Sequence, residues 1–299
     1  MDKKLLFIVN PRAGRTKSFA PLFDAVACFS KAGYLVKVFL TEGRGDATRA
    51  AAELGGAYDL VVCAGGDGTF NEMVSGLMQL PECPEVGYLP NGSTNDFAAS
   101  LKIPSSPVLA ARQIVASQGR DLDIGRFQDR YFVYVASFGA FTKASYSTPQ
   151  SVKNALGHVA YVLQGAKELF QIPKEHVAFQ TDSGSFEGDY IFGAISNSTS
   201  VGGILTLDPS VVDMQDGKFE LMLIRPPKDA VELMGCIQAL TGQRYDTPML
   251  TFCSASCLTV TANPEMPWTL DGEKEEGHET VEVENLHRAI RLIQKGAVV

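Results

Sequence analysis

The chain has 299 residues, 45% of them hydrophobic and 20% charged, which is enough to bury one or two cores and excludes a disordered or fibrous protein. Its 26 basic and 34 acidic residues give a formal net charge of -8, which argues against a nucleic-acid partner bound through phosphates. The six cysteines show no CxxC spacing, and the early apolar run at residues 5–9 is too short for a signal peptide. We therefore expect a soluble, cytoplasmic protein with reduced thiols.

Charge is distributed unevenly along the chain. Residues 1–120 carry a net charge of +1, whereas residues 121–299 carry a net charge of -9. The nearly neutral part is better suited to approach an anionic ligand. We therefore expect two domains with a boundary near residue 120.

Strand and helix patterns alternate through residues 1–120. Continuous apolar runs predict buried strands at residues 5–9, 34–40, 59–64 and 86–89. Helical spacing predicts helices at about residues 18–32, 46–54 and 71–79. Strands separated by helices of this length form an open, doubly wound, mostly parallel α/β sheet through right-handed crossovers.

Beyond residue 120 the pattern changes to short alternating runs separated by turn residues. These runs predict strands at residues 130–136, 177–181, 190–196, 218–224, 257–262 and 279–283. Helical stretches interrupt them at residues 152–170 and about 230–240. We expect a β-rich, antiparallel domain over residues 121–299, whose C-terminal segment can return to the first domain.

The segment Gly65-Gly66-Asp67-Gly68-Thr69 directly follows an apolar strand. Glycines let the backbone approach a ligand closely, and successive N–H groups before a helix form an anion site. A carboxylate beside phosphates needs a cation between them, so Asp67 suggests a Mg²⁺ bridge to nucleotide phosphates. The alternative is a tight strand-to-helix turn that is capped by Asp67.

Two more Gly/Asn-rich loops follow predicted strands, N-P-R-A-G at residues 10–14 and N-G-S-T-N-D-F at residues 91–97. Loops at the carboxyl ends of parallel strands face one crevice, so all three loops can converge on one ligand. The sequence contains neither G-x-x-x-x-G-K-[ST] nor G-x-G-x-x-G, so neither a P-loop nor a Rossmann dinucleotide site is supported.

The order N-P-x-x-G, G-G-D-G-T-x-N-E and P-x-G-S-x-N-D-F-A resembles the catalytic domain of the diacylglycerol kinase superfamily, which includes sphingosine, ceramide and bacterial lipid kinases. Residues 156–161, 213–217 and 270–273 look like the second domain of the bacterial members, so the resemblance covers essentially the whole chain. It implies an ATP-dependent kinase that phosphorylates diacylglycerol or a related lipid to a lipid phosphate such as phosphatidic acid. It also implies an active site in the interdomain cleft.

The resemblance implies that ATP is bound by the loops of the first domain. The matching positions are Asn10, Pro11, Arg12, Ala13, Gly14, Thr41, Gly65, Gly66, Asp67, Gly68, Thr69, Phe70, Asn71, Glu72 and Thr94. From the sequence alone, Thr41 is better explained as a strand end or helix cap. Ala99 stands where related chains often carry an arginine, and Arg12, Arg15 and Lys17 could supply the missing positive charge.

By the same resemblance, the second domain adds a metal site and a catalytic site. Mg²⁺ is implied at Asp213, Asp216 and the backbone carbonyl of Lys218, hard oxygen ligands that suit this ion; a type I′ turn at Asp216-Gly217 is the alternative. Glu273 matches the catalytic acid/base of the family, which accepts the proton of a lipid hydroxyl. Asp271 is assigned a supporting role, as a metal-orienting residue or an alternative base. Without the resemblance, these two acids flanking a glycine indicate an ordinary hairpin turn.

Two other functions stay open. An NAD kinase shares the G-G-D-G segment, although it need not carry the N-P-x-x-G and N-D-F-A loops. The second is a catalytically inactive protein that binds a nucleotide or a lipid. The presence of Asp67, Asp271 and Glu273 argues against it. The sequence identifies neither the lipid nor the oligomeric state, although homodimers are common among enzymes. We expect peripheral contact with the inner membrane surface, where a lipid substrate lies.

Overall fold

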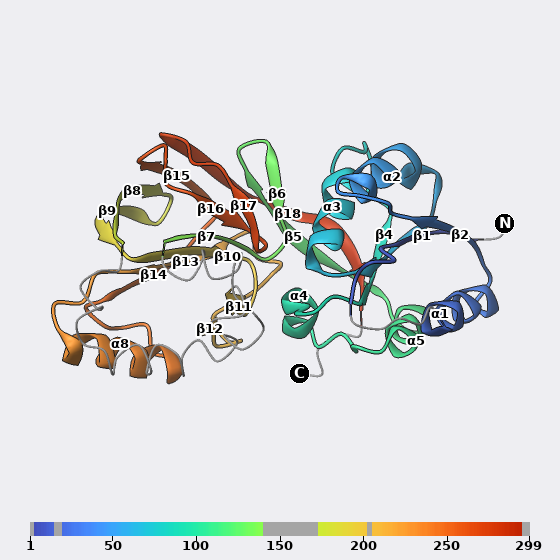
Figure 1. Cartoon of the computed structure of the whole chain (residues 1–299), viewed down its shortest axis with the longest axis horizontal. Coiled ribbons are helices and arrows are strands. Elements are labelled where there is room, and N and C mark those ends of the chain that lie inside the picture. The colour runs from blue at the N-terminus through green and yellow to red at the C-terminus, as the bar shows by residue number, and fades with distance from the viewer. Residues whose placement is uncertain (1–2, 15–19, 140–172, 202–204, 295–299) are drawn as a thin grey trace. The chain divides into compact units, whose positions relative to one another are not determined.

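The computed structural model describes residues 3–14, 20–139, 173–201 and 205–294 (Figure 1). The chain forms two compact units, of which unit 1 comprises Met1–Ile124 and His287–Val299, and unit 2 comprises Gly125–Leu286. Unit 1 is therefore built from two separate stretches of sequence. The strands β5 (Gly119–Phe127) and β18 (Thr280–Ile293) carry the chain from one unit into the other.

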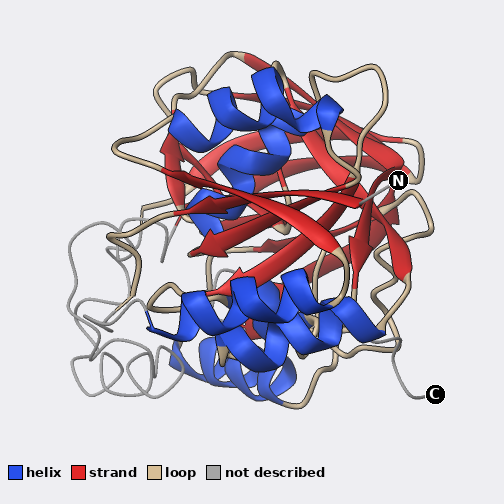
Figure 2. Ribbon diagram, turned by 90° about the vertical axis from the view of Figure 1, so that its right-hand side faces the viewer, coloured by secondary structure: helices blue, strands red, loops and turns tan. Residues whose placement is uncertain are grey.

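Unit 1 contains a parallel sheet with helices on both faces. The strand order is β2-β1-β3-β4-β18, and each neighbouring pair is parallel. Helices α1 and α5 pack together on one face, and α2 packs on α3 over the other (Figures 1 and 2). Both faces are thus covered, which explains the continuous apolar runs of these strands. The elements are β1 (Lys3–Val9), α1 (Ala20–Lys31), β2 (Tyr34–Leu40), α2 (Asp46–Leu54), a 3₁₀ turn (Gly55–Ala57), β3 (Leu60–Gly65), α3 (Asp67–Leu77), β4 (Glu85–Pro90), α4 (Asp96–Ser100) and α5 (Pro107–Ala116).

Unit 2 draws on two sheets. The first continues the sheet that holds β2-β1-β3-β4-β18: its order runs on through β18-β15-β8-β9 with antiparallel neighbours, and β5 pairs with β18 and β6. The second has the order β14-β13-β10-β7-β16-β17 and is antiparallel. The elements are β6 (Arg130–Phe132), β7 (Val135–Gly139), β8 (Glu175–Thr181), β9 (Gly184–Tyr190), β10 (Phe192–Ser196), β11 (Ser200–Val201), β12 (Leu205–Thr206), β13 (Phe219–Ile224), α8 (Ala230–Thr241), β14 (Leu250–Ala255), β15 (Cys257–Ala262), β16 (Trp268–Leu270) and β17 (Glu273–Glu275). Strands β11 and β12 form a separate two-stranded ribbon.

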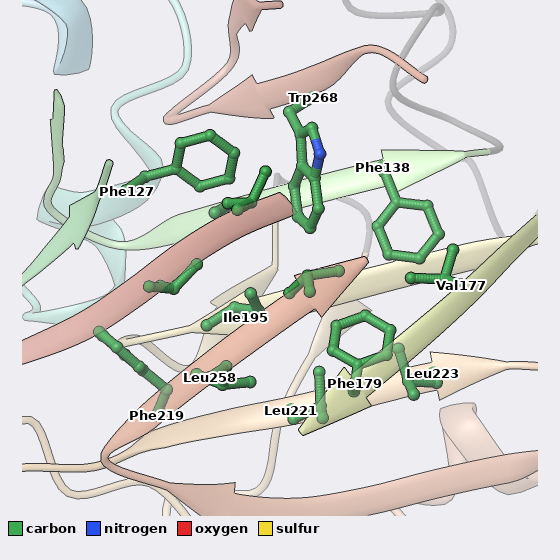
Figure 3. Packing of buried hydrophobic residues seen from close by; sticks show 14 of the residues in the cluster. Phe127, Phe138, Val177, Phe179, Ile195, Phe219, Leu221, Leu223, Leu258 and Trp268 are labelled. Carbon is green, nitrogen blue, oxygen red and sulfur yellow. The ribbon is translucent and has the colours of Figure 1, made fainter. Parts of the chain in front are cut away.

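The core of unit 2 lies between its two sheets (Figure 3). Trp268 of one sheet is 1% exposed, and its ring centroid lies 5.0 Å from that of Phe127 on the other sheet and 5.1 Å from that of Phe138. Side chains from β13 and β15, among them Leu221 and Leu258, belong to the same buried cluster. This core explains why β15 and the first half of β18 alternate between buried and more exposed residues, whereas β10 and β13 are buried along their whole length.

The predicted architecture, an α/β part followed by an antiparallel β-rich part, is confirmed. Several elements differ from the prediction: α3 begins at Asp67 rather than near residue 71, the strand predicted at residues 130–136 is split into β6 and β7, and the strand predicted at residues 279–283 runs from Thr280 to Ile293 as β18. The predicted helix at residues 152–170 and the segment at 156–161 lie outside the described residues. Within the described ranges, no helix has the length and apolar character needed to span a bilayer.

Candidate functional site

The parallel strands of unit 1 end side by side, and the residues predicted to bind ATP begin at these ends. The backbone N–H groups of Thr41, Asn10 and Asn91 donate to carbonyls of the neighbouring strands at 2.9, 2.9 and 2.7 Å. The ladder therefore continues one residue past each strand, and Thr41 is buried at this edge. As a result, the loops that follow β1, β3 and β4 leave the sheet next to one another.

Side-chain hydrogen bonds join the three loops. Asn10 Nδ2 donates to Thr69 Oγ1 at 3.0 Å, which links the first loop to the second. Asn91 Nδ2 donates to the carbonyl of Ala13 at 3.3 Å, which links the third loop to the first. The three loops, at residues 10–14, 65–72 and 91–97, thus form one continuous surface, as their positions after parallel strands predict.

Glycine is required at two close approaches between these loops. A Cβ atom on Gly92 would lie 2.6 Å from the Cα atom of Gly66, a distance that real Cβ atoms essentially never show. Gly14 has a φ angle of +82°, and a Cβ atom there would lie 2.4 Å from the carbonyl oxygen of Asn91. These glycines therefore allow backbone to meet backbone, and the Gly92 N–H donates to Asn95 Oδ1 at 2.8 Å within the third loop.

Asp67 fastens the second loop to the third. Its carboxylate accepts a hydrogen bond from the backbone N–H of Asp96 at 2.8 Å and from the Tyr88 hydroxyl at 3.2 Å. Burial raises the pKa of Asp67 above its usual value, while these hydrogen bonds and one from the Phe97 N–H act in the opposite direction. The Phe70 ring packs against Tyr88 and Phe97, with centroids 4.5 and 5.2 Å away. Asp67 thus holds the start of α4 close to the start of α3.

The N-terminus of α3 offers donors to an anion. Its N-cap is Gly66, which has no side chain to bond the first-turn N–H groups. These groups and the helix dipole favour a phosphate at this end. The carboxylate of Glu72, which lies further along α3, accepts a hydrogen bond from the backbone N–H of Gly45 at Oε1, at 2.9 Å. This hydrogen bond fixes the carboxylate on the loop that precedes α2.

The predicted ATP residues differ in exposure. Arg12, Gly14 and Thr94 are exposed, Thr41, Gly65 and Phe70 are buried, and the others are half-buried, namely Asn10, Pro11, Ala13, Gly66, Asp67, Gly68, Thr69, Asn71 and Glu72. Arg12 therefore offers its positive charge to solvent beside the loops. Arg15 and Lys17 lie outside the described residues.

In unit 2, Asp271 and Gly272 form the two-residue turn between β16 and β17. Their φ angles are 49° and 85°, as a type I′ hairpin requires. Glu273 is the first residue of β17, is half-buried, and pairs with Leu270 across the hairpin. The hairpin interpretation of this segment is therefore correct, and it is compatible with a catalytic role for Glu273.

The Asp271 carboxylate is bound by the backbone. It accepts the N–H groups of Val133, Tyr134 and Val135 at 2.6, 3.0 and 3.0 Å, and the residue is 5% exposed. These N–H groups turn toward the carboxylate instead of a neighbouring strand, which accounts for the break between β6 and β7. Asp271 thus anchors the turn that carries Glu273.

The predicted metal loop precedes β13. Asp213 Oδ1 accepts the N–H of Gln215 at 3.1 Å, and Asp216 Oδ1 accepts the N–H of Lys218 at 2.9 Å. Asp216-Gly217 lies in a loop well after β12 and is not the two-residue turn between strands that the alternative interpretation predicts. The Lys218 carbonyl accepts a hydrogen bond from Asn285 Nδ2 at 3.0 Å.

Glu220, which the sequence analysis overlooked, lies two residues after this loop. It is 2% exposed, and its Oε2 has no hydrogen-bond partner. Burial, together with the negative charges of Asp216 and Asp213, raises its pKa to about 8. An acid within the apolar strand F-E-L-M-L-I was the available signal.

The donor set of this loop fits a hard cation. Carboxylate and carbonyl oxygens are the ligands of Mg²⁺, and an unpartnered buried carboxylate oxygen is stabilised by a positive charge. Across the described ranges, no three His, Cys, Asp or Glu side chains are placed to hold a metal by themselves. An ion here would therefore depend on backbone carbonyls and water in addition to side chains.

Known proteins share this sequence and fold. The family model described as diacylglycerol kinase catalytic domain matches residues 4–127. A diacylglycerol kinase of Bacillus subtilis (strain 168) is 34% identical over 293 residues, covering 97% of this chain and 96% of that protein, and one of Staphylococcus epidermidis is 33% identical over 91% of this chain and 86% of its own. The crystal structure of a diacylglycerol kinase from Bacillus anthracis, 22% identical, has the same fold with a TM-score of 0.77 over 99% of this chain and 98% of that chain. The chain belongs to the diacylglycerol kinase family, a family of lipid kinases.

Proposed function

We propose that this kinase transfers the γ-phosphoryl group of ATP to the free hydroxyl of diacylglycerol. The observation that carries the proposal is the meeting of three Gly/Asn-rich loops at one edge of the unit 1 sheet, beside the open N-terminus of α3. Such a surface suits a polyphosphate, because no side chain caps the first-turn N–H groups of α3 beside it. The chain matches relatives named diacylglycerol kinase over most of its length and most of theirs, which supports diacylglycerol as the phosphoryl acceptor.

In the proposed reaction, both units contribute residues. The loops of unit 1 hold the phosphates of ATP, with Asn10, Thr69 and the glycines shaping the surface. The lipid hydroxyl oxygen forms a bond to the γ-phosphorus, and the bond from that phosphorus to the β,γ-bridging oxygen breaks, which releases ADP. Glu273 accepts the proton of the hydroxyl.

Asp271 acts as a positioning residue in this proposal. Both of its oxygens are engaged by backbone N–H groups, so its place is to hold the turn and thereby Glu273. Asp213, Asp216 and the carbonyl of Lys218 would hold Mg²⁺, which would tie this loop together through hard oxygen ligands.

The proposed substrate places the enzyme at a lipid surface. Because a diacylglycerol is confined to a bilayer, we propose peripheral association of a cytoplasmic protein with the inner membrane surface. Sedimentation with vesicles tests this: we expect binding to vesicles that contain diacylglycerol. Equal binding to vesicles without diacylglycerol would show that the protein recognises another component of the membrane.

A Mg²⁺–ATP kinase assay with product masses tests the proposed function. The acceptors are diacylglycerol, monoacylglycerol, sphingosine, ceramide, a polyprenol and NAD, each with the full chain. We expect phosphatidic acid as the main product. Preferred phosphorylation of another lipid would contradict the choice of acceptor, NADP as the main product would identify an NAD kinase, and ATP binding without any product would identify an inactive binding protein.

A further inference from the structure

Two buried oxygen atoms without partners lie at the metal loop of unit 2. One is Glu220 Oε2, on β13, and the other is Asn285 Oδ1, on β18. Asn285 is 9% exposed, and its amide nitrogen already donates to the carbonyl of Lys218. Its unpartnered oxygen therefore belongs to the same amide group that contacts the loop.

Glu220 lies close to two acidic side chains. The charges that act on it are those of Asp216 and Asp213, and both are negative. Across the sheet it pairs with Ser196 and Ser254, and the Ser196 hydroxyl donates to the carbonyl of Ser198 at 2.8 Å. A carboxylate in such a place is costly unless a cation or a donor satisfies it.

We propose that Glu220 and Asn285 complete the cation site of the Asp213–Lys218 loop. Glu220 presents a carboxylate oxygen to the ion, and Asn285 both fixes the Lys218 carbonyl and adds its own amide oxygen. The ligand is a hard divalent cation such as Mg²⁺ or Mn²⁺, since every group offered is an oxygen. This inference rests on the metal loop of the proposed function, and it ties the loop to two strands of unit 2.

The sheet sets the separation between this ion site and the catalytic turn. Glu220 pairs with Ser196, Ser196 pairs with Val135, and the Val135 N–H donates to Asp271. Two strand spacings, roughly 10 Å, separate the backbone of Glu220 from that of Val135. The strand that carries Glu220 and the hairpin that carries Glu273 therefore belong to the same antiparallel sheet.

Binding of Mn²⁺ to the full chain, followed by electron paramagnetic resonance in the absence of nucleotide, tests the proposal. We expect Glu220→Gln to weaken Mn²⁺ affinity at least about tenfold, the scale of losses when a group supporting a metal is removed. Glu282→Gln is the matched control, because it removes the same charge from an exposed position on β18 of the same unit; its affinity should stay within about twofold of wild type. Asn285→Ala should also weaken Mn²⁺ binding, and it serves as the second variant if Glu220→Gln fails to fold.

Melting temperatures separate a cation ligand from a merely structural residue. In EDTA, Glu220→Gln should melt no lower than wild type, because it removes an unpaired buried carboxylate. At saturating Mn²⁺, the melting temperature of wild type should rise further above its value in EDTA than that of the variant. Wild-type Mn²⁺ affinity in both Glu220→Gln and Asn285→Ala, or a melting temperature of Glu220→Gln lowered equally with and without Mn²⁺, would overturn this inference alone. Absence of Mn²⁺ binding by wild type would instead overturn the metal loop of the proposed function, and this inference with it.

Discussion

Replacing Asp271 with asparagine separates a positioning role from a direct role in the chemistry. Asparagine keeps the shape of the side chain and tolerates the left-handed backbone at this turn, but it has one acceptor oxygen instead of two. If that oxygen replaces Oδ1, it keeps the hydrogen bonds from Tyr134 and Val135, while the amide group meets the Val133 N–H donor to donor.

The expected loss follows from these three hydrogen bonds. A hydrogen bond to a charged group contributes about 1.5–3 kcal/mol and one between neutral groups about 1 kcal/mol, and a buried donor left without a partner costs about 1–3 kcal/mol. One bond is lost and two become neutral, so the free energy of unfolding should fall by about 4 kcal/mol. For a unit of this size each kcal/mol corresponds to about 2–4 °C, so the melting temperature should fall by about 8–16 °C.

Calorimetry gives the melting temperature, and a kinase assay well below the transition gives the turnover. Asp182→Asn is the matched control: Asp182 also lies in a hairpin turn and accepts the Ser256 N–H and hydroxyl, but it is exposed, so its replacement should cost less than about 1 kcal/mol. A stable Asp271→Asn enzyme, melting within about 2 °C of wild type but without turnover, would refute the positioning role and identify Asp271 as a participant in proton transfer.

Three further predictions concern the proposed base, the glycine contacts and a surface ion pair. Glu273→Gln should lower kcat by about 10²–10⁴-fold, the usual contribution of a general base, with an unchanged melting temperature; near-wild-type turnover would remove Glu273 from the mechanism. Gly92→Ala should weaken ATP binding at least about tenfold in calorimetric titration, because its Cβ atom would push against Gly66; unchanged affinity would show that ATP does not use this contact. His176, bound to Asp189 at 3.0 Å, should show a pKa above 6.5 by NMR, so the ion pair stabilises the fold at low pH and this contribution is lost as pH rises through the raised pKa. Asp189→Asn should lower that pKa, and no change would argue against the pair.

Much of the fold could be predicted because local patterns determine it. Residues 34–40, 46–54 and 257–262 were predicted with the same bounds that β2, α2 and β15 have in the structure. The departures come from contacts that no local pattern reveals. The break between β6 and β7 depends on the Asp271 carboxylate, more than a hundred residues away. Strand β18 continues far beyond the predicted residues 279–283, because Asp123 accepts the N–H of Arg288 and supports its left-handed backbone.

The candidate site follows the same rule: what local sequence patterns determine could be predicted, and what long-range contacts determine could not. The three loops of unit 1 are marked by glycine and asparagine directly after apolar runs, so their location followed from strand order. The early start of α3 was missed because Asp67 and Gly68 look like loop residues, although they form the first helical turn. Glu220 was missed because its burial depends on β10 and β14, which lie on either side of it only in the folded sheet.

The split composition of unit 1 constrains the order in which the chain can fold. Unit 2 is one uninterrupted segment, so it can fold as soon as residue 286 has been synthesised. The sheet of unit 1 must wait longer, because its strand β4 pairs with Arg291 and Leu292 of β18, which are made after all of unit 2. Until then, the β4 edge of the unit 1 sheet is exposed to other chains. An arrested chain lacking β18 should therefore be prone to aggregation through this open edge.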